Sequence, residues 1–232
     1  MNYLKKLKDQ TLLETYLKKY LLDTYLNKNL INYCELHTFN KNEMICTLNE
    51  NMYYMYFLVK GKAKIYTLIS TGKSLLLSFT TPLSIMGDIE FLDNPAADCS
   101  VQALECCYCI AIPIDKVQKF ACNDPKFLRF IIYSLEKKLR NNSNFSSINM
   151  LYPLKNRFAS YLLSIPSTDD NIVEIEELTH ISELLGSSYR HLNRVIKDLC
   201  DTNIILKELN TIKILNIDKL KMLALDIYKH EK

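Results

Sequence analysis

The sequence predicts an α+β protein of two domains, with strands in the first half and helices in the second. From Cys34 to about Pro113, short runs rich in aromatic and branched residues alternate apolar and polar positions between turn signals, which favours a compact antiparallel barrel or sandwich. After Asn123-Asp124-Pro125, apolar residues recur at helical spacing. The chain has 232 residues, 48% of them hydrophobic, so each domain can bury a core of its own. We expect the domains to span residues 1–150 and 151–232.

Composition narrows the class of protein. No apolar run approaches the roughly 18 residues that cross a membrane, and the first residues lack the apolar core of a signal peptide. The eight cysteines are irregularly spaced, which indicates reduced thiols in a cytosol and not a disulfide framework. We therefore expect a soluble, cytoplasmic protein with no membrane partner. The net charge of +3 is too small for a uniformly basic surface.

The first half also contains two helical patterns outside the strands. Residues 1–33 alternate apolar and basic groups at helical spacing and predict one or two amphipathic helices before the main fold. Asp124 and Pro125 mark the start of a long helix. Its apolar stripe is too wide for one contact, so it is predicted to pack on the barrel and on a partner chain. The stripe contains Phe127, Ile131, Leu135, Leu139, Phe145 and Ile148. A polar run at 141–144 predicts a hinge within 140–152.

The second half predicts a helix-turn-helix. A helix over about 152–165 ends before Pro166, and residues 167–171 form a turn. Ile181, Leu184 and Leu185 give one short helix an inner face, and Gly186 supplies the tight turn after it. A second helix follows, with an inner face of Leu192, Val195, Ile196 and Leu199. Residues 204–215 are similar to the two strands of a wing.

The outer face of this second helix has the residue types that bind DNA. Ser187 or Ser188 caps the helix, and no acid occurs from 186 to 197. Arginine pairs with guanine, asparagine with adenine, and cap hydroxyls with phosphate. The predicted DNA-binding residues are Ser187, Ser188, Tyr189, Arg190, His191, Asn193, Arg194 and Lys197. Residues 153–232 are not basic overall, so affinity must come from this local surface, supplemented by Lys155 and Arg157.

The order of barrel, long helix and winged helix-turn-helix resembles the Crp/Fnr family of bacterial transcription regulators, over about residues 36–215. KNEMI, YFLVKGKAKIY, TGKSLLLSF and PLSIMGDIEFL are similar to its barrel, and all four glycines fall where the family has turn glycines. GDIEF and SSYRHL are most similar to the YeiL-type subgroup. The resemblance implies a cyclic-nucleotide-binding-like barrel (a double-stranded β-helix) and a homodimer on an inverted-repeat operator in double-stranded DNA. It also implies RNA polymerase as a partner. Ser188 and His191 match the family's phosphate-contacting positions, and Tyr189, Arg190 and Arg194 match its base-reading positions.

The same resemblance assigns a degenerate effector pocket to Gly87, Asp88, Ile89, Glu90, Ala97 and Asp98. The family's cyclic-nucleotide sensors need an acid for the ribose and an Arg–Ser pair for the cyclic phosphate. Asp88 supplies the acid, but Ala97 and Asp98 occupy the Arg–Ser positions. Cyclic AMP is therefore not expected to bind, and no cofactor is expected. Aromatic side chains are expected to fill the pocket, with a pocket that admits an apolar ligand as the second reading; these side chains are Tyr53, Tyr54, Tyr56, Phe57, Phe79 and Phe91.

The sequence leaves three alternative functional classes to consider. A redox or metal sensor would use Cys106, Cys107 and Cys109. The segment ECCYCIAIP is predicted as a strand, which points residues 106 and 109 to opposite faces, so buried free thiols and no metal site are expected. An enzyme on a similar barrel needs clustered histidines, and only His37 falls in the barrel, so no catalytic residue is predicted. A regulatory protein that has lost DNA binding would show acids where Arg190 and Arg194 stand.

Overall fold

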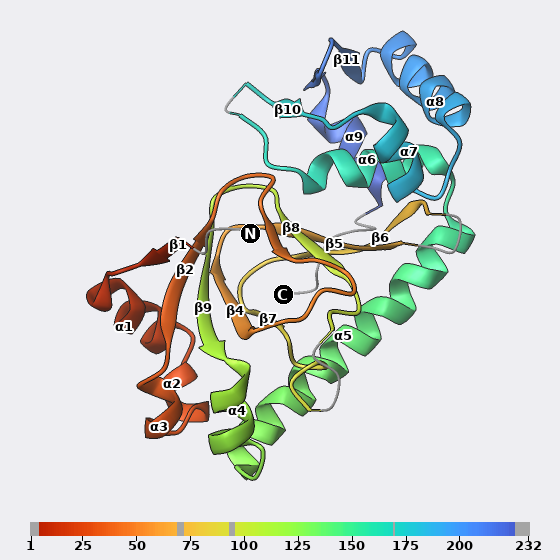
Figure 1. Ribbon diagram of the computed structural model, residues 1–232. Coiled ribbons are helices and arrows are strands. Elements are labelled where there is room, and N and C mark those ends of the chain that lie inside the picture. Colours follow the sequence, from red (N-terminus) through yellow and green to blue (C-terminus); the bar gives the residue numbers. More distant parts are fainter. Residues whose placement is uncertain (1–4, 69–71, 93–95, 169, 226–232) are drawn as a thin grey trace. The chain divides into compact units, whose positions relative to one another are not determined.

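The computed structural model describes residues 5–68, 72–92, 96–168 and 170–225, with side chains left out at residue 5 and at 141–150. The chain divides into two compact units (Figure 1), residues 1–65 with 80–141 and residues 66–79 with 142–232. The predicted α+β class is confirmed. Residues 66–79, expected in the first domain, group with the second unit. No helix in the described ranges is long and apolar enough to cross a membrane.

The strands between residues 35 and 113 build two sheets. Their bounds are β2 Glu35–Phe39, β3 Met44–Cys46, β4 Tyr54–Lys60, β5 Ala63–Leu68, β6 Ser74–Thr80, β7 Ser84–Met86, β8 Ser100–Ala103 and β9 Cys107–Pro113. One sheet has the order β1-β2-β9-β4-β7, in which β1 is Lys5–Leu7, and the other has the order β3-β8-β5-β6. Strand β9 pairs antiparallel with both β2 and β4. This is the antiparallel architecture that the alternating pattern predicted.

Strand β4 is buried on both faces. Successive side chains of this strand point alternately to the two faces, so neighbouring residues pack against different parts of the first unit. Tyr56 packs edge-on against Phe39, with ring centroids 5.6 Å apart, whereas Phe57 on the opposite face stacks on Phe130 of the long helix at 6.3 Å. Of the aromatic residues expected to fill the pocket, four pack in or against the core of the first unit: Tyr54, Tyr56, Phe57 and Phe91. Phe79 instead groups with the second unit, where its ring lies 5.9 Å from that of Tyr161. Tyr53 precedes the strand and its ring is exposed.

The N-terminal residues form helices α1 Gln10–Lys19, α2 Leu22–Tyr25 and α3 Lys28–Ile31. These helices lie beside β2 (Figure 1), and their leucines join the core of the first unit. The structure adds a strand that the sequence pattern did not predict, β1 Lys5–Leu7, which pairs antiparallel with β2. So short a strand is specified by its partner edge and not by its own sequence. Helix α4 Ile114–Ala121 was also not predicted and follows β9 directly.

The long helix is α5 Pro125–Leu151, and Asp124 accepts a hydrogen bond from the Lys126 amide at its start, as the sequence predicted. The expected break within 140–152 lies at the end of that range. Helix α5 ends at Leu151, and Pro153 is the N-cap of α6 Leu154–Ser164. The residues expected to weaken the helix, 141–144, and the side chains of Phe145 and Ile148 lie outside the described side chains.

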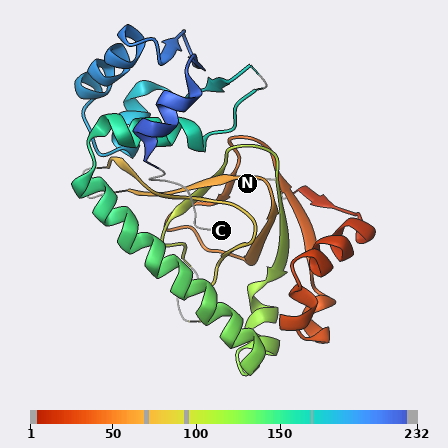
Figure 2. The ribbon, with the colours of Figure 1, turned by 180° about the vertical axis from the view of Figure 1, so that it is seen from behind.

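The second unit contains the predicted helix-turn-helix (Figure 2). Helix α7 Leu178–Leu184 and helix α8 Tyr189–Asp201 are joined through Gly186, whose φ of +58° lies in the left-handed region that glycine favours. The wing comprises β11 Ile205–Lys207 and β12 Thr211–Ile214. Two elements were not predicted: β10 Ile172–Glu174, which pairs with β12, and helix α9 Ile217–Ala224. All seven predicted inner-face residues of α7 and α8 are buried.

Candidate nucleic-acid interface and sensor cassette

The start of helix α8 is built for anion contact. Ser188 is its N-cap, and its Oγ accepts a hydrogen bond from the amide of His191 at 3.2 Å. The first amides of a helix have no partner within the helix and point outward, so they favour negative groups. Ser187 Oγ lies 3.4 Å from His191 Nδ1. The capping role predicted for the serine pair thus belongs to Ser188.

The outer face of α8 is exposed and basic. Tyr189, Arg190, His191, Arg194 and Lys197 are exposed, and Asn193 is half-buried. Within the described part of the chain, Arg190 and Arg194 make no ion pair and no hydrogen bond to another side chain. Because they are one helical turn apart, both guanidinium groups lie on the same side of the helix. A planar arginine fork left free in this way can pair with a guanine edge or a phosphate.

Lys155 and Arg157 both have partners within the second unit, and the burial of Arg157 corrects the expectation that it supplements the DNA surface. Arg157 is buried, and its Nη1 donates to the carbonyl of Leu185, next to the turn of the helix-turn-helix. Its Nε donates to the carbonyl of Tyr152 at 3.2 Å. Lys155 Nζ binds Asp198 of α8 at 2.6 Å. Arg157 therefore braces the domain from inside, whereas the pair of Lys155 with Asp198 is partly exposed, with side chains 33% and 52% exposed.

The wing offers a second exposed element that the sequence pattern located only roughly. Leu206 of β11 pairs with Lys213 of β12, and both side chains are exposed. Leu209, in the turn between these strands, is 93% exposed. Lys213 is thus an exposed cation of the wing, whereas the turn itself presents an apolar side chain beside Glu208. The wing contributes little charge, so the basic surface remains centred on α8.

In the first unit, the residues assigned to the effector pocket belong to the described stretches 87–92 and 96–98, which are together called the cassette below. Gly87 begins it with a φ of +90°, and a Cβ there would lie 3.2 Å from the Cα of Met55. Glycine is therefore required both by the backbone angle and by the close approach to β4. Of the predicted pocket residues, Asp88, Glu90 and Ala97 are buried, and Ile89 and Asp98 are exposed.

Helix α5 supplies partners to Asp88. Asp88 Oδ1 accepts a hydrogen bond from Lys138 Nζ at 2.5 Å, and Oδ2 accepts one from Ser134 Oγ at 3.2 Å. The predicted ribose ligand is thus occupied by its own chain. Sequence analysis missed Ser134 and Lys138, because they lie about fifty positions beyond Asp88 and follow no local motif.

Glu90 takes up backbone donors of the cassette. Its carboxylate accepts hydrogen bonds from the amides of Ile89 and Asp98, each at 3.3 Å. Backbone amides of this kind are what a loop offers to a bound anion. The buried carboxylate of Glu90 therefore stands where an anionic ligand would find its donors.

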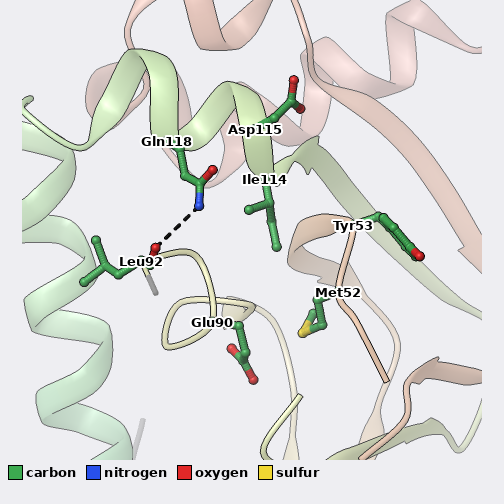
Figure 3. Close-up of a pocket in the computed structure, with 7 residues that line it drawn as sticks. All are labelled: Met52, Tyr53, Glu90, Leu92, Ile114, Asp115 and Gln118. Carbon is green, nitrogen blue, oxygen red and sulfur yellow. Dashed lines mark hydrogen bonds between the residues drawn. The ribbon is translucent and has the colours of Figure 1, made fainter. Parts of the chain in front are cut away.

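A pocket of about 440 Å³ opens beside the cassette and is shown in Figure 3. Met52 and Tyr53 lie on the opposite side from Leu92 and Gln118, and Gln118 Nε2 donates to the carbonyls of Phe91 at 2.8 Å and Leu92 at 3.5 Å. Glu90 and Asp115 give the lining two carboxylates, and none of its seven residues is basic. This pocket suits an anionic ligand poorly.

The cysteine cluster of β9 is divided between surface and core. Cys106 is exposed, whereas Cys107 and Cys109 are buried. Burial raises the pKa of the Cys107 thiol to about 11, and it raises the pKa of Cys109 well above its ordinary value. Buried thiols with raised pKa values react slowly, because the thiolate is the reactive form. No group of three metal-ligating side chains gathers anywhere in the described ranges.

Two residues of α5 that were predicted to contact a partner chain face their own subunit instead. Phe127 and Ile131 are buried in the core of their own subunit, because that side of the helix packs against the barrel. They are not available to a second chain. Leu135 is half-buried and Leu139 is 72% exposed. The neighbouring Ile132, not singled out by the pattern, is 64% exposed.

Comparison with known families agrees with both halves of the chain. Residues 36–124 match the cyclic nucleotide-binding domain, and residues 156–223 match the Crp-like helix-turn-helix domain. A solved structure of a Crp/Fnr-family transcriptional regulator from Eubacterium rectale is similar with a TM-score of 0.77 and 15% identity. It covers 91% of this chain and 99% of that one, which supports the fold.

Curated relatives supply the family. The regulatory protein YeiL of Escherichia coli O157:H7 is 30% identical over 174 residues, which are 75% of this chain and 78% of YeiL. The cAMP-activated global transcriptional regulator CRP of Haemophilus influenzae is 20% identical over 182 residues, which are 75% of this chain and 81% of that protein. With its barrel, long helix and helix-turn-helix, the chain belongs to the Crp/Fnr family of transcription regulators.

Proposed function

We propose that this protein is a homodimeric regulator that binds a specific inverted-repeat operator and does not respond to cyclic AMP. The observation that carries the DNA-binding part is the pair of free arginines, Arg190 and Arg194, on the exposed face of α8. They follow the Ser188 cap, so the helix start can meet phosphate while the two forks meet base edges in the major groove. Such a regulator acts on the chromosome in the cytoplasm, and RNA polymerase is its expected partner.

The outer stripe of α5 supports the homodimer. Leu128, Ile132, Leu135 and Leu139 follow one another at intervals of four, three and four residues, all half-buried or exposed. This is the apolar spacing with which two helices pack along a common seam. Two α8 helices related by a two-fold axis would read half-sites one turn of DNA apart, about 34 Å, and would require an inverted repeat.

The cassette supports the absence of cyclic AMP binding. Asp88 is already bonded to α5, Glu90 holds two backbone amides, and Ala97 and Asp98 offer no cation to a phosphate. An anion placed beside these carboxylates would lose its hydration, and the cation beside them, Lys138, is already paired with Asp88. The relative CRP is cAMP-activated by name, and these residues are where we expect this chain to differ from it.

The two regulatory alternatives have weaker support. A redox switch through Cys106, Cys107 and Cys109 would need paired reactive thiols, but two of the three are buried with raised pKa values. A protein that had lost DNA binding would present acids or bulky apolar groups where Arg190 and Arg194 stand. We also infer a regulatory and not a catalytic role.

The test is selection of genomic DNA fragments by the purified full-length protein, followed by sedimentation analysis of the bound complex. Two chains on each selected fragment and an inverted repeat common to the fragments are expected. A single chain per fragment, or equal affinity for every fragment, would contradict the proposal. Titration calorimetry with cyclic AMP and cyclic GMP should show no saturable heat at about 10 μM, where binding corresponds to about −7 kcal/mol.

A further inference from the structure

The carboxylate of Asp88 joins the cassette to helix α5. Its side chain is 1% exposed, and both oxygens accept hydrogen bonds from the helix, one from Lys138 and one from Ser134. The two donors are one helical turn apart, so the carboxylate is held at two points. A buried carboxylate is stable only when it is paired and hydrogen-bonded. The position of α5 and the charge of Asp88 are therefore coupled.

The rest of the cassette is held by contacts within the same unit. Phe91 packs edge-on against Phe127 of α5, with ring centroids 6.1 Å apart, and Gln118 of α4 binds the carbonyl of Phe91 at 2.8 Å. Glu90 accepts the amides of Ile89 and Asp98. Each contact uses the chain's own groups, so the cassette is fixed to α4 and α5 without a ligand.

We infer that Asp88, Ser134 and Lys138 form a built-in lock that holds α5 against the cassette and makes DNA binding independent of a small-molecule effector. The inference rests on the proposed function. An effector shifts a protein between two states only by binding one of them more tightly. An ion pair that forms in only one of the two states stabilises that state relative to the other in the same way, but without a ligand. Helix α5 ends at Leu151 and α6 begins at Leu154, so only two residues of the chain separate the locked helix from the first helix of the DNA-binding domain.

The experiment compares DNA affinity before and after removal of any bound small molecule. Natively purified protein and protein unfolded in guanidinium chloride, dialysed and refolded are titrated with a fragment that the protein selects. Both wild-type preparations should bind with equal affinity. Lys138→Met should weaken binding about tenfold or more, and Lys138→Arg should restore it. Ser134→Ala, which removes one hydrogen bond and no charge, should have a smaller effect in the same direction.

The matched control is the ion pair between Glu136 and Arg140 on the same helix. It joins Oε1 to Nη2 at 2.8 Å, but both side chains are exposed, and exposed pairs contribute little. Glu136→Gln should therefore leave DNA affinity unchanged. Circular dichroism at the assay temperature establishes that every variant is folded. Hydrogen exchange over residues 125–140 should become faster in Lys138→Met and, to a smaller extent, in Ser134→Ala, but not in Glu136→Gln.

Each outcome bears on one claim. The lock would be overturned if folded Lys138→Met bound DNA with wild-type affinity. It would also be overturned if Glu136→Gln weakened DNA binding as much as Lys138→Met does. If Lys138→Met does not fold, Ser134→Ala with unchanged affinity and exchange overturns it instead. Effector independence would be overturned if the native protein bound DNA but the refolded protein bound it only after addition of cyclic AMP or cyclic GMP, or did not bind it at all. The DNA-binding part of the proposed function would still stand in that case. If neither preparation selects any fragment, the proposed function itself fails.

Discussion

The guanidinium of Arg157 donates a hydrogen bond to the carbonyl of Leu185, which ends α7 immediately before the turn that leads to α8. A second bond, to the carbonyl of Tyr152, ties the same side chain to the end of α5. One buried cation thus satisfies two carbonyls that the ends of helices leave unpaired. The geometry of the turn depends on a residue that never reaches the DNA.

Replacing Arg157 should therefore weaken the domain and not only the interface. We expect Arg157→Ala to lower the free energy of unfolding by about 2–3 kcal/mol, since hydrogen bonds to a charged donor are lost and a carbonyl stays buried. Arg157→Lys should recover only part of this, because an ammonium lacks the planar fork. Urea denaturation measures the effect, with the exposed Arg140→Ala as control. Equal stability of Arg157→Ala and Arg140→Ala would contradict the bracing role.

Arg190 and Arg194 should govern which sequence is bound. Arg190→Ala or Arg194→Ala should each lower specific affinity by about 1–3 kcal/mol and relax the preference at one base position, as loss of a guanine contact does. Lys197→Ala, further along the helix, should weaken specific and random DNA alike if it meets phosphate. Gel-shift titration against an operator and its single-base variants distinguishes the two. Uniform loss in both arginine variants would assign them to phosphate.

Two adjacent residues of α5 separate dimerisation from folding. Ile132 is 64% exposed and lies in the proposed seam, whereas Ile131 is 3% exposed and packs in the core. Ile132→Asp should leave the subunit folded and raise the dimer dissociation constant at least about tenfold, because a charge in an apolar seam loses hydration. Ile131→Asp should instead destabilise folding by about 4 kcal/mol or more. Sedimentation equilibrium and thermal melting of both variants give the result. An unaffected Ile132→Asp dimer would contradict the seam.

The parts that the sequence predicted are those that local chemistry specifies. Gly186, the Ser188 cap and the inner faces of α7 and α8 are set by neighbours within a few residues, and each lies where the pattern indicated. The long helix shows the limit of such reasoning. Both Ile131 and Ile132 are apolar, so periodicity alone could not tell which side meets the barrel.

The contacts that escaped prediction join distant parts of the sequence. Lys138 and Asp88 are fifty positions apart, and nothing in the local sequence around either residue indicates that the other is its partner. Arg157 lies close to Lys155, and two nearby basic residues suggested a solvent-facing surface. Tertiary packing nevertheless buries Arg157. Strand β1 exists because the edge of β2 accepts it. In each case the missing information is the three-dimensional partner, which a single sequence does not contain.

The thiols should differ widely in reactivity. Burial raises the pKa of Cys34 to about 12 and that of Cys99 to about 11, and it raises the pKa of Cys107 likewise. Cys106 is exposed on the surface. We expect Cys106 to react first with a disulfide reagent at pH 8, and Cys106→Ser to remove this fast phase without changing DNA affinity. Loss of DNA binding on oxidation of the wild type, absent in Cys106→Ser, would instead revive the redox alternative.

Stability should fall in mild acid because of a buried histidine. His37 is 1% exposed, its Nε2 lies 2.9 Å from Glu35 Oε2, and no described residue bonds to its Nδ1. Burial lowers the pKa of His37 below its ordinary 6.5, despite the opposing effect of Glu35. The groups that face this pair are Lys6, which binds Glu35 at 2.6 Å, and the rings of Tyr54 and Tyr56.

The sign follows from the proton that each state binds. Below about pH 6.5 the unfolded chain protonates His37 while the folded protein does not, so the free energy of unfolding falls by at most about 1.4 kcal/mol per pH unit. Burial alone would raise the pKa of Glu35, but its hydrogen bonds from Lys6 and His37 lower it overall, which adds a second loss as the pH falls below about 4.5. His37→Gln should remove the first decline, and the exposed His191→Gln should preserve it. Denaturation between pH 5 and 8 gives the slopes, and an unchanged slope in His37→Gln would assign the decline to another group.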